Sequence, residues 1–263
     1  MTRVQPAGDV DYAKIGVGYS KLRQPDPRIA AMIRARLGAA RTVLNVGAGA
    51  GSYEPLDRHV IAIEPAATMR AQRPAHLSPA IDAVAEKLPL DDASVDASMA
   101  ILTVHQWKDR AAGLRELLRV TRGAIVLMTF DPATLHVWWL DHYVSEMHAA
   151  ERGRLPGLEE LAQRLSEGGR RVEVVPVPIP RDCTDGFTEA YFARPERFLE
   201  PAVTGAQSVW EFVGRGVRER FVGQLGEDLR SGAWDAKFGA YRAMETMVGA
   251  LRLVVSVGEE ETK

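Results

Sequence analysis

The chain has 263 residues and a formal net charge of −2, with 46% hydrophobic and 26% charged residues. This is the composition of a globular protein, and the near-zero net charge gives no support to a nucleic-acid interface that binds phosphates. The single cysteine, Cys183, excludes an internal disulfide and a metal site made of several cysteines. Because no apolar run reaches about 20 residues and the start lacks the apolar stretch of a secretory signal, we expect a cytoplasmic protein without a membrane partner.

The first half of the chain alternates between helix-like and strand-like segments. Apolar residues recur at helical spacing over 26–37, where Asp26 can cap the helix and Pro27 suits its first position. The next expected elements are a strand at 42–47, a strand at 60–64, a short helix at 65–72, a strand at 95–104, a helix at 108–123 and a strand at 124–130. This alternation predicts an α/β fold with a mainly parallel sheet, which binds its ligand beyond the carboxyl ends of the strands.

The second half of the chain is mostly helical in pattern. Helix-like segments occupy 135–154, which is rich in aromatic residues, 158–169 and most of 186–247. Residues 171–180 alternate like a strand, but three prolines confine that strand to a sheet edge or to the end of a strand. A final strand is expected at 250–257. Since no Gly/Ser-rich linker separates these segments, we predict one domain, residues 1–263, with helical insertions.

The strongest chemical signal is the segment VLNVGAGAGSYE at 43–54, which leaves the first strand through three glycines. Glycines at a strand end let the backbone turn sharply and approach a ligand closely. Glu64 ends the next strand, where a carboxylate can accept both hydroxyls of a ribose. A dinucleotide loop would need a third glycine at Ser52, and a phosphate loop would need a following Lys-Ser/Thr pair. The Gly-x-Gly-x-Gly spacing therefore favours a zwitterionic amino-acid group as the ligand, with a glycine-rich turn that binds nothing as the alternative.

Residues 43–132 resemble the class I S-adenosylmethionine (SAM)-dependent methyltransferases, in particular the small-molecule type 11 group. The matching stretches are VLNVGAGAGSYE (43–54), VIAIEPAATM (60–69), AEKLPLDDASVDA (85–97), HQWKD (105–109), LRELLRVTRG (114–123) and AIVLMTFDP (124–132), and the resemblance extends to 12–29 and 178–187. It implies a Rossmann-like, doubly wound, mainly parallel sheet of seven strands, with the core motifs at 42–132. It also implies a helical N-terminal segment and helical insertions that cover the active site, at about 133–170 and 181–247.

The resemblance further implies SAM as the cofactor and a set of residues around it. These residues are Tyr19, Arg23, Gly47, Ala48, Gly49, Gly51, Glu64, Pro65, Met69, Ala85, Glu86, Ala100 and Ile101. The glycine loop would pack against the methionine part of SAM, and Glu64 would hold the ribose diol. The adenine would lie between Pro65 and Met69, with Ala85 and Glu86 at its edge.

The amino-acid end of SAM would meet the backbone of Ala100 and Ile101. Tyr19 and Arg23 would close over the cofactor, with the Arg23 guanidinium on the SAM carboxylate.

Two positions depart from the family's pattern. Asn45 stands where an acidic residue is usual, so this position keeps a hydrogen-bond acceptor but loses the negative charge. Val84 stands where an aspartate often contacts the adenine amine.

His105 is the candidate general base, because it follows the 95–104 strand at the sheet end where the methyl donor should lie. The alternative is that His105 and Trp107 only pack the loop. Three aromatic residues, Trp138, Trp139 and Tyr143, either line an apolar acceptor pocket or cap the core.

Two further groups of residues carry weaker signals. His142 and His148 lie near Asp141 and Glu146 on one expected helix, but their spacing does not predict a metal site. Cys183, in a loop with Asp182 and Asp185, is expected to be a small buried residue and not a nucleophile.

The sequence therefore predicts a SAM-dependent methyltransferase of the EC 2.1.1 type that acts on a small-molecule acceptor. Two alternatives stay open: an NAD-dependent oxidoreductase on a related sheet, and a SAM-binding regulatory protein that transfers nothing. Nucleic-acid methylation is disfavoured, because AILT at 100–103 lacks the Asn-Pro-Pro-aromatic motif of enzymes that methylate base amines. No metal is expected, and the oligomeric state is left open.

Overall fold

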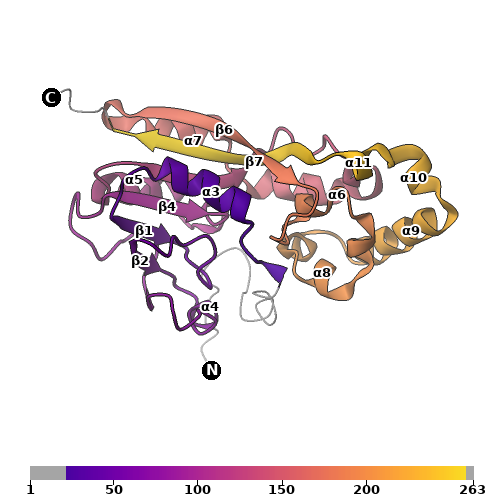
Figure 1. Cartoon of the computed structure of the whole chain (residues 1–263), viewed down its shortest axis with the longest axis horizontal. Helices are drawn as coiled ribbons and strands as arrows, with labels where there is room; N and C mark the ends of the chain where they lie inside the picture. Colours follow the sequence, from indigo (N-terminus) through magenta and orange to yellow (C-terminus); the bar gives the residue numbers. More distant parts are fainter. Residues whose placement is uncertain (1–21, 259–263) are drawn as a thin grey trace.

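The computed structural model describes residues 22–258, and its centre is one seven-stranded sheet (Figure 1). The strands are β1 (Thr42–Val46), β2 (His59–Ile63), β3 (Ala80–Ile81), β4 (Ala97–Ile101), β5 (Ile125–Phe130), β6 (Arg171–Pro180) and β7 (Thr246–Val257). Their order across the sheet is β3-β2-β1-β4-β5-β7-β6. Strands β1 to β5 run parallel to one another, and β7 is antiparallel to both of its neighbours. The predicted Rossmann-like, mainly parallel sheet of seven strands is confirmed.

The strand order places a crevice at the centre of the sheet. The chain leaves β1 for β2 and β3 on one side and then returns to β4 on the other side of β1. At such a switch point the connections that follow the two central strands diverge, and ligands bind in the gap between them. Here the gap lies beyond Val46 of β1 and Ile101 of β4, where the glycine loop begins.

Helices cover both faces of the sheet, and the strands are apolar on both faces as a consequence. The helices are α3 (Pro27–Arg36), α4 (Ala67–Arg70), α5 (Arg110–Val120), α6 (Leu140–Arg154), α7 (Leu158–Leu165), α8 (Pro201–Gly205), α9 (Val217–Ser231), α10 (Ala233–Phe238) and α11 (Ala240–Ala243). Successive residues of β1 face opposite sides: Val43 packs with Ile29 and Ile33 of α3, whereas Leu44 lies in the cluster that contains α5 and α7.

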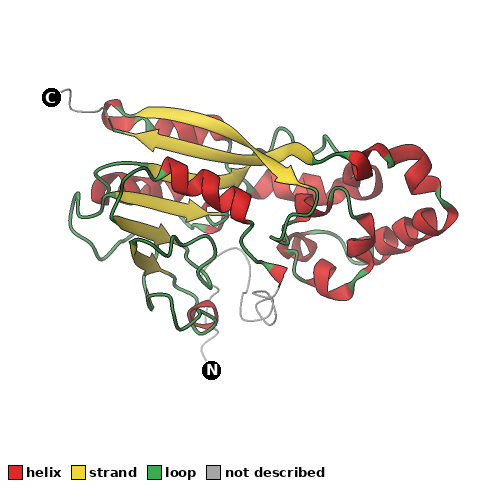
Figure 2. Cartoon of the chain, in the orientation of Figure 1, coloured by secondary structure: helices red, strands yellow, loops and turns green. Residues whose placement is uncertain are grey.

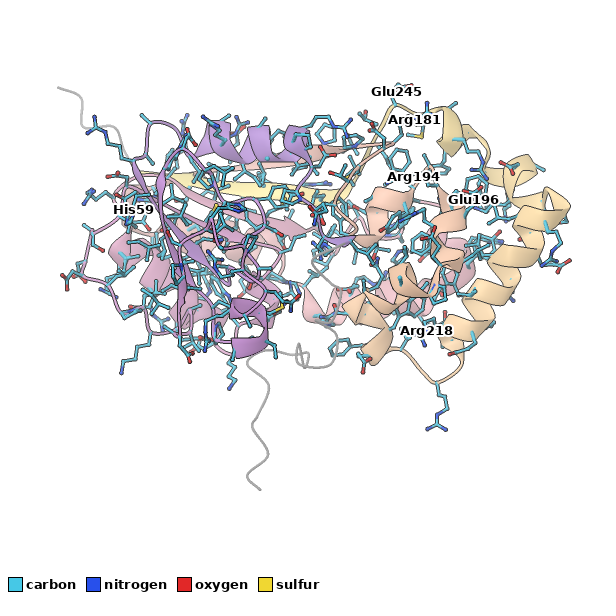
Figure 3. All side chains as sticks on the ribbon, turned by 60° about the horizontal axis from the view of Figure 1, so that its bottom comes forward. His59, Arg181, Arg194, Glu196, Arg218 and Glu245 are labelled. Atoms are coloured by element: carbon cyan, nitrogen blue, oxygen red, sulfur yellow. The ribbon has the colours of Figure 1, made fainter. Side chains whose placement is uncertain are left out.

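A second, mostly helical region lies beyond one end of the sheet and contains α8 to α10 (Figures 1 and 2). The long ribbon formed by β6 and β7 reaches it, and β6 is the edge strand, as its prolines predict. The two strands are tied together where β6 ends and β7 begins, because the Arg181 backbone N–H donates to the Glu245 carbonyl at 3.0 Å. The Arg181 and Glu245 side chains also pair there, at 3.2 Å (Figure 3).

The structure differs from the sequence-based expectations mainly at element ends. Helix α7 ends at Leu165, because Gly168 has a φ of +73° that a helix cannot continue through. Strand β7 begins at Thr246 instead of 250, since its first residues pair with the end of β6. Strand β3 was not predicted, because two residues carry no periodicity. No helix within residues 22–258 is long and apolar enough to cross a membrane.

Trp139 is 1% exposed and belongs to the same buried cluster as Val126 and Met128 of β5 and the residues of the helical region. Its ring makes edge-to-face contacts with Trp138, Phe198 and Trp234, with centroids 5.2, 5.7 and 5.5 Å away. Its Nε1–H donates to the Phe192 carbonyl at 2.7 Å. Such aromatic pairs add to the free energy gained by burial.

We expect Trp139→Ala to lower the free energy of unfolding by about 3–5 kcal/mol, the usual cost of removing a large buried aromatic side chain. Trp139→Phe keeps a ring but leaves the Phe192 carbonyl without its donor, so its cost should be smaller, about 1–3 kcal/mol. Urea unfolding of both variants measures this order. A loss below about 1 kcal/mol for the alanine variant would show that Trp139 does not hold the helical region to the sheet.

Candidate functional site

The loop after β1 follows a path that only glycine adopts easily. Gly47, Gly49 and Gly51 have φ values of +69°, +52° and +95°. A Cβ on Gly47 would overlap the Thr103 side chain, and a Cβ on Gly51 would overlap the Leu77 side chain. Glycine is therefore needed here by packing as well as by backbone conformation. The loop curves around a cavity at the carboxyl ends of β1, β2 and β4.

Glu64 follows β2 and is bonded to the glycine loop. Its Oε2 accepts a hydrogen bond from the Gly49 backbone N–H, and its Oε1 accepts one from the Ala66 N–H, both at 2.8 Å. The residue is 7% exposed, and burial raises the pKa of its carboxyl in spite of these two hydrogen bonds. Each oxygen keeps a second lone pair, so the carboxylate can still accept two donors from a ligand in the cavity.

Asn45 presents an acceptor to the same cavity. Its Nδ2 donates to Glu54 Oε1 at 2.9 Å, and Glu54 pairs with Arg73 at 2.8 Å. Its Oδ1 is buried and has no partner among residues 22–258. A buried acceptor without a donor is costly, so this atom is suited to a ligand N–H group. Position 45 has no acidic side chain, but Glu54, which accepts a hydrogen bond from Asn45, places a carboxylate beside it.

The cavity brings together about half of the residues that the sequence analysis selected. Those that line it are Arg23, Gly47, Ala48, Gly49, Glu64, Met69 and Ile101. Residues that the sequence analysis did not select also line it, among them Tyr53, Thr103 and Gln106. Tyr53 and Gln106 fall inside the stretches 43–54 and 105–109 that carried the family resemblance, so the motif contained them although no role was assigned.

Other selected residues lie outside this lining. Gly51 and Pro65 do not line it, and the side chains of Ala85 and Ala100 are buried in the apolar cluster around α5 and α7. Glu86 accepts a hydrogen bond from the Asp109 backbone N–H at the start of α5, at 3.1 Å. Tyr19 lies outside the described residues.

Arg23 is held at the edge of the cavity by a buried carboxylate. Its Nε lies 2.5 Å from Asp185 Oδ1, and Asp185 is 1% exposed. The Tyr53 hydroxyl donates to the other Asp185 oxygen at 2.9 Å. Burial, together with the Asp185 charge, raises the pKa of Tyr53, so this hydroxyl stays protonated and donates. The guanidinium therefore has a protein carboxylate as a partner, in addition to any ligand.

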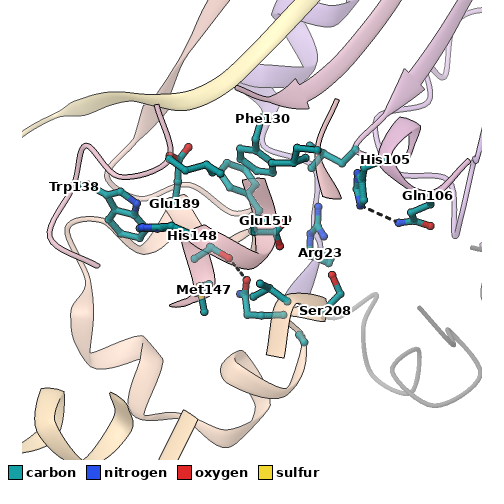
Figure 4. Close-up of a pocket in the computed structure, with 18 residues that line it drawn as sticks. Arg23, His105, Gln106, Phe130, Trp138, Met147, His148, Glu151, Glu189 and Ser208 are labelled. Carbon is teal, nitrogen blue, oxygen red and sulfur yellow. Dashed lines mark hydrogen bonds between the residues drawn. The ribbon is translucent and has the colours of Figure 1, made fainter. Parts of the chain in front are cut away.

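A second cavity adjoins the first and shares Arg23, Leu102 and Gln106 with it. It holds about 790 Å³, counting space open to solvent, and lies between the end of β5, α6 and residues 187–209 (Figure 4). Its apolar lining consists of Leu102, Phe130, Leu135, Trp138, Met147, Leu155, Phe187, Ala206 and Val209. A mostly apolar cavity with a few polar groups is typical of a site for a small molecule.

Several titratable groups line this second cavity. His105 lies near the shared end, with its Nε2 3.5 Å from Gln106 Nε2. His148 Nδ1 lies 2.8 Å from Asp141 Oδ1, and burial lowers the pKa of the imidazole. Glu189 is 3% exposed, and burial raises the pKa of its carboxyl to about 7. Glu189 lies within the expected insertion at 181–247, but the sequence analysis assigned it no role.

The aromatic residues after β5 separate into two roles. Trp138 lines the second cavity, whereas Trp139 and Tyr143 do not. The Tyr143 ring packs in the core, and its hydroxyl donates to Asp228 at 2.6 Å. Cys183 is 3% exposed, and burial raises the pKa of its thiol to about 12, so it is a packing residue, as expected.

A metal site does not form among the described residues, since no three His, Cys, Asp or Glu side chains of this part of the chain lie close enough to hold an ion. His148 pairs with Asp141, but His142 lies 3.1 Å from Lys237 Nζ and not beside a carboxylate.

Comparisons with known proteins point to one kind of enzyme. A family model described as a methyltransferase domain (Methyltransf_11) matches residues 44–127. A solved structure from Anabaena variabilis, described as a methyltransferase of an antibiotic biosynthesis pathway, is 30% identical with a TM-score of 0.83. The match covers 90% of this chain and 99% of that one. A search of curated proteins finds no match.

More distant solved structures share the fold alone. Phosphoethanolamine N-methyltransferase 2 of Haemonchus contortus is 13% identical with a TM-score of 0.56, and the match covers 95% of this chain and 57% of that one. Geranyl diphosphate C-methyltransferase of Streptomyces coelicolor, solved with S-adenosylhomocysteine (SAH), is 15% identical with a TM-score of 0.51. That match covers 87% of this chain and 77% of that one.

Proposed function

As this chain belongs to the class I SAM-dependent methyltransferase family, we propose that it transfers a methyl group from SAM to a small-molecule acceptor. The observation that carries the proposal is the junction of two cavities at Arg23, Leu102 and Gln106. The first cavity has the polar groups that a nucleoside and an amino-acid group need. The second is mostly apolar and is built from the insertions after β5 and β6, so a donor and an acceptor would meet at the junction.

The residues present fit SAM. The buried Asn45 Oδ1 lacks a donor among residues 22–258, and an ammonium group would supply one. Glu64 can accept the two ribose hydroxyls through its remaining lone pairs, and Met69 would contact the adenine. Arg23, already oriented by Asp185, would bind the cofactor carboxylate.

The other selected residues keep supporting roles in this proposal. Gly47, Ala48 and Gly49 would leave room for the methionine part, and Ile101 would meet it at the end of β4. For the remaining selected residues, a role in binding SAM rests on the family resemblance alone. These residues are Tyr19, Gly51, Pro65, Ala85, Glu86 and Ala100.

When bound, SAM supplies a methyl group that a nucleophile can attack, because the positively charged sulfur can leave as a neutral thioether. The chain's own contribution is to exclude water and to align the two molecules, and the apolar walls of the second cavity serve this purpose. An imidazole nitrogen of His105, near the shared end, would take a proton from a hydroxyl or ammonium acceptor. We propose one catalytic domain, whose insertions at 133–170 and 181–247 build the acceptor side.

Calorimetric titration of the full chain with SAM and, separately, with NADH tests the cofactor assignment. We expect SAM to bind and NADH to bind far more weakly, because the loop lacks the third glycine of a dinucleotide site. If SAM binds, incubation with isotopically labelled SAM and a metabolite extract should give labelled products. Absence of SAM binding at millimolar concentration would contradict the proposal, and binding without transfer to any acceptor would favour a regulatory protein.

Glu64→Ala should weaken SAM binding by about 1–3 kcal/mol, or roughly 5- to 150-fold, because two charge-assisted hydrogen bonds are lost. Asp92→Ala, which removes an exposed carboxylate outside both cavities, is the control and should leave the affinity unchanged. Calorimetry measures both. An unchanged affinity for the Glu64 variant would show that this carboxylate does not hold the ribose.

The same carboxylate predicts a pH dependence. Burial raises the pKa of Glu64, so on acidification this side chain is protonated at a higher pH than an exposed glutamate. The affinity of the unmodified chain for SAM should therefore fall as the pH is lowered, and Glu64→Ala should remove that part of the dependence. An identical pH profile for both proteins would exclude Glu64 as its origin.

His105→Ala should lower turnover about a hundredfold while the affinity for SAM is kept, the usual size of general-base catalysis. The acceptor found with labelled SAM serves as the substrate. His148→Gln, a change at another histidine of the same cavity, is the matched control and should cost much less, because that imidazole is engaged by Asp141. If turnover falls equally in the two variants, or does not fall in His105→Ala, then His105 only packs the loop and is not a general base.

A further inference from the structure

Glu189 is a buried carboxylate on the wall of the second cavity, in the 3₁₀ helix Thr188–Tyr191. It is 3% exposed, and both of its oxygens accept from the Ala250 backbone N–H of β7, at 2.8 and 3.0 Å. Gly249 beside it cannot carry a side chain, because a Cβ there would lie 2.6 Å from the carboxylate. Backbone N–H groups hold Glu189, and within the described part of the chain no side chain donates a hydrogen bond to it.

Glu189 differs from the other charged groups at this cavity, because no side chain within residues 22–258 pairs with it. Asp185 pairs with Arg23 at 2.5 Å, and Arg154 pairs with Glu151 at 2.9 Å. His148 Nδ1 lies 2.8 Å from the Asp141 carboxylate.

A buried carboxylate is stabilised by a nearby positive charge, and the described residues give Glu189 only a weak one. Arg252 is the positive group that acts on Glu189, but its guanidinium donates to the Gly249 and Leu251 carbonyls. Burial therefore outweighs both the hydrogen bonds and Arg252, and it raises the pKa of Glu189 to about 7. At neutral pH about half of the molecules hold an ionised carboxylate that a cationic ligand would stabilise.

Aromatic rings line the same cavity as Glu189. Phe130, Trp138 and Phe187 line the cavity, and the Phe130 and Phe187 rings meet edge to face at 5.8 Å. Glu189 lies between Trp138 and Phe130, on the side of the cavity away from His105 and Gln106 (Figure 4). A carboxylate together with aromatic faces is a combination that binds ammonium groups.

We propose that Glu189, with the rings of Phe130, Trp138 and Phe187, is an ammonium-binding site and that the methyl acceptor is a cationic amine with an apolar body. The inference rests on the proposed function, because it treats the second cavity as the acceptor site. Since Glu189 lies away from the cavity junction, it is a binding residue that orients the acceptor, whose nucleophilic atom would lie near His105.

Three probes of similar size and different charge test this inference on the full chain with SAH bound. They are phenethylamine, which is cationic, 2-phenylethanol, which is neutral, and 3-phenylpropionate, which is anionic. Calorimetry should give the tightest binding for phenethylamine, at least tenfold tighter than for either analogue. Equal binding of the three probes, or no phenethylamine binding at 10 mM, would overturn the inference. Failure of SAH itself to bind would instead contradict the proposed function.

Glu189→Gln tests the residue directly, because it keeps the shape and removes the charge. Phenethylamine should bind at least tenfold more weakly to this variant, while 2-phenylethanol should bind as before. Glu151→Gln, at the carboxylate that pairs with Arg154, is the matched control and should change phenethylamine binding less than threefold. An equal loss in both variants, or a kept amine preference in Glu189→Gln, would overturn the inference. Unchanged SAH affinity verifies that each variant is folded.

A pH series on the unmodified chain gives a second, independent measurement. Phenethylamine stays cationic from pH 6 to 8, whereas a carboxyl with a pKa of about 7 goes from roughly 10% to 90% ionised. Binding should therefore strengthen about tenfold over this range. The other charged or titratable groups that line the cavity are Arg23, His105, His148 and Glu151. Arg252 of β7 is not in this lining, but its charge acts on Glu189.

The histidines need a control, because protonation of His148 at low pH would also repel an amine. The tenfold change should persist in His148→Gln and disappear in Glu189→Gln. A pH dependence that survives in Glu189→Gln would overturn the assignment of the cation to Glu189.

Discussion

The buried charge of Asp185 joins three segments that are far apart in the sequence. Its two oxygens bind Arg23, from the segment before α3, and the hydroxyl of Tyr53, which closes the glycine loop. A buried carboxylate is tolerated only when donors surround it, so this contact fixes the position of each segment relative to the others. Because Arg23 borders both cavities, the same contact also determines where the two cavities meet.

Local pattern predicted the half of the molecule in which sequence neighbours are also neighbours in space. The strand 42–47, the glycine loop and Glu64 follow one another within residues 42–64, so their order in the chain already indicated their places at the sheet. Tertiary partners could not be predicted in this way. The partner of Arg23 lies 162 residues away, and Glu189 is buried by a strand that pairs with β5 and β6 from the far end of the chain.

Two adjacent residues at the second cavity illustrate the same limit. Trp138 and Trp139 precede α6 and have the same chemistry, yet Trp138 lines the second cavity while Trp139 is buried against Phe198 and Trp234. The sequence predicted a helix from residue 135, but α6 starts at Leu140, so both tryptophans lie outside it. The helical periodicity therefore does not govern which way their rings face, and the sequence pattern could not assign them.

The position of β7 in the sheet has a consequence for how the enzyme is synthesised. Strands β1 to β5 and the glycine loop lie within residues 42–130 and leave the ribosome first, whereas Asp185, which holds Arg23, is made later. The wall of the second cavity is completed last, because Glu189 is bonded to the Ala250 backbone N–H of the last strand that the structure describes. Neither cavity can therefore take its full form until most of the chain has been synthesised.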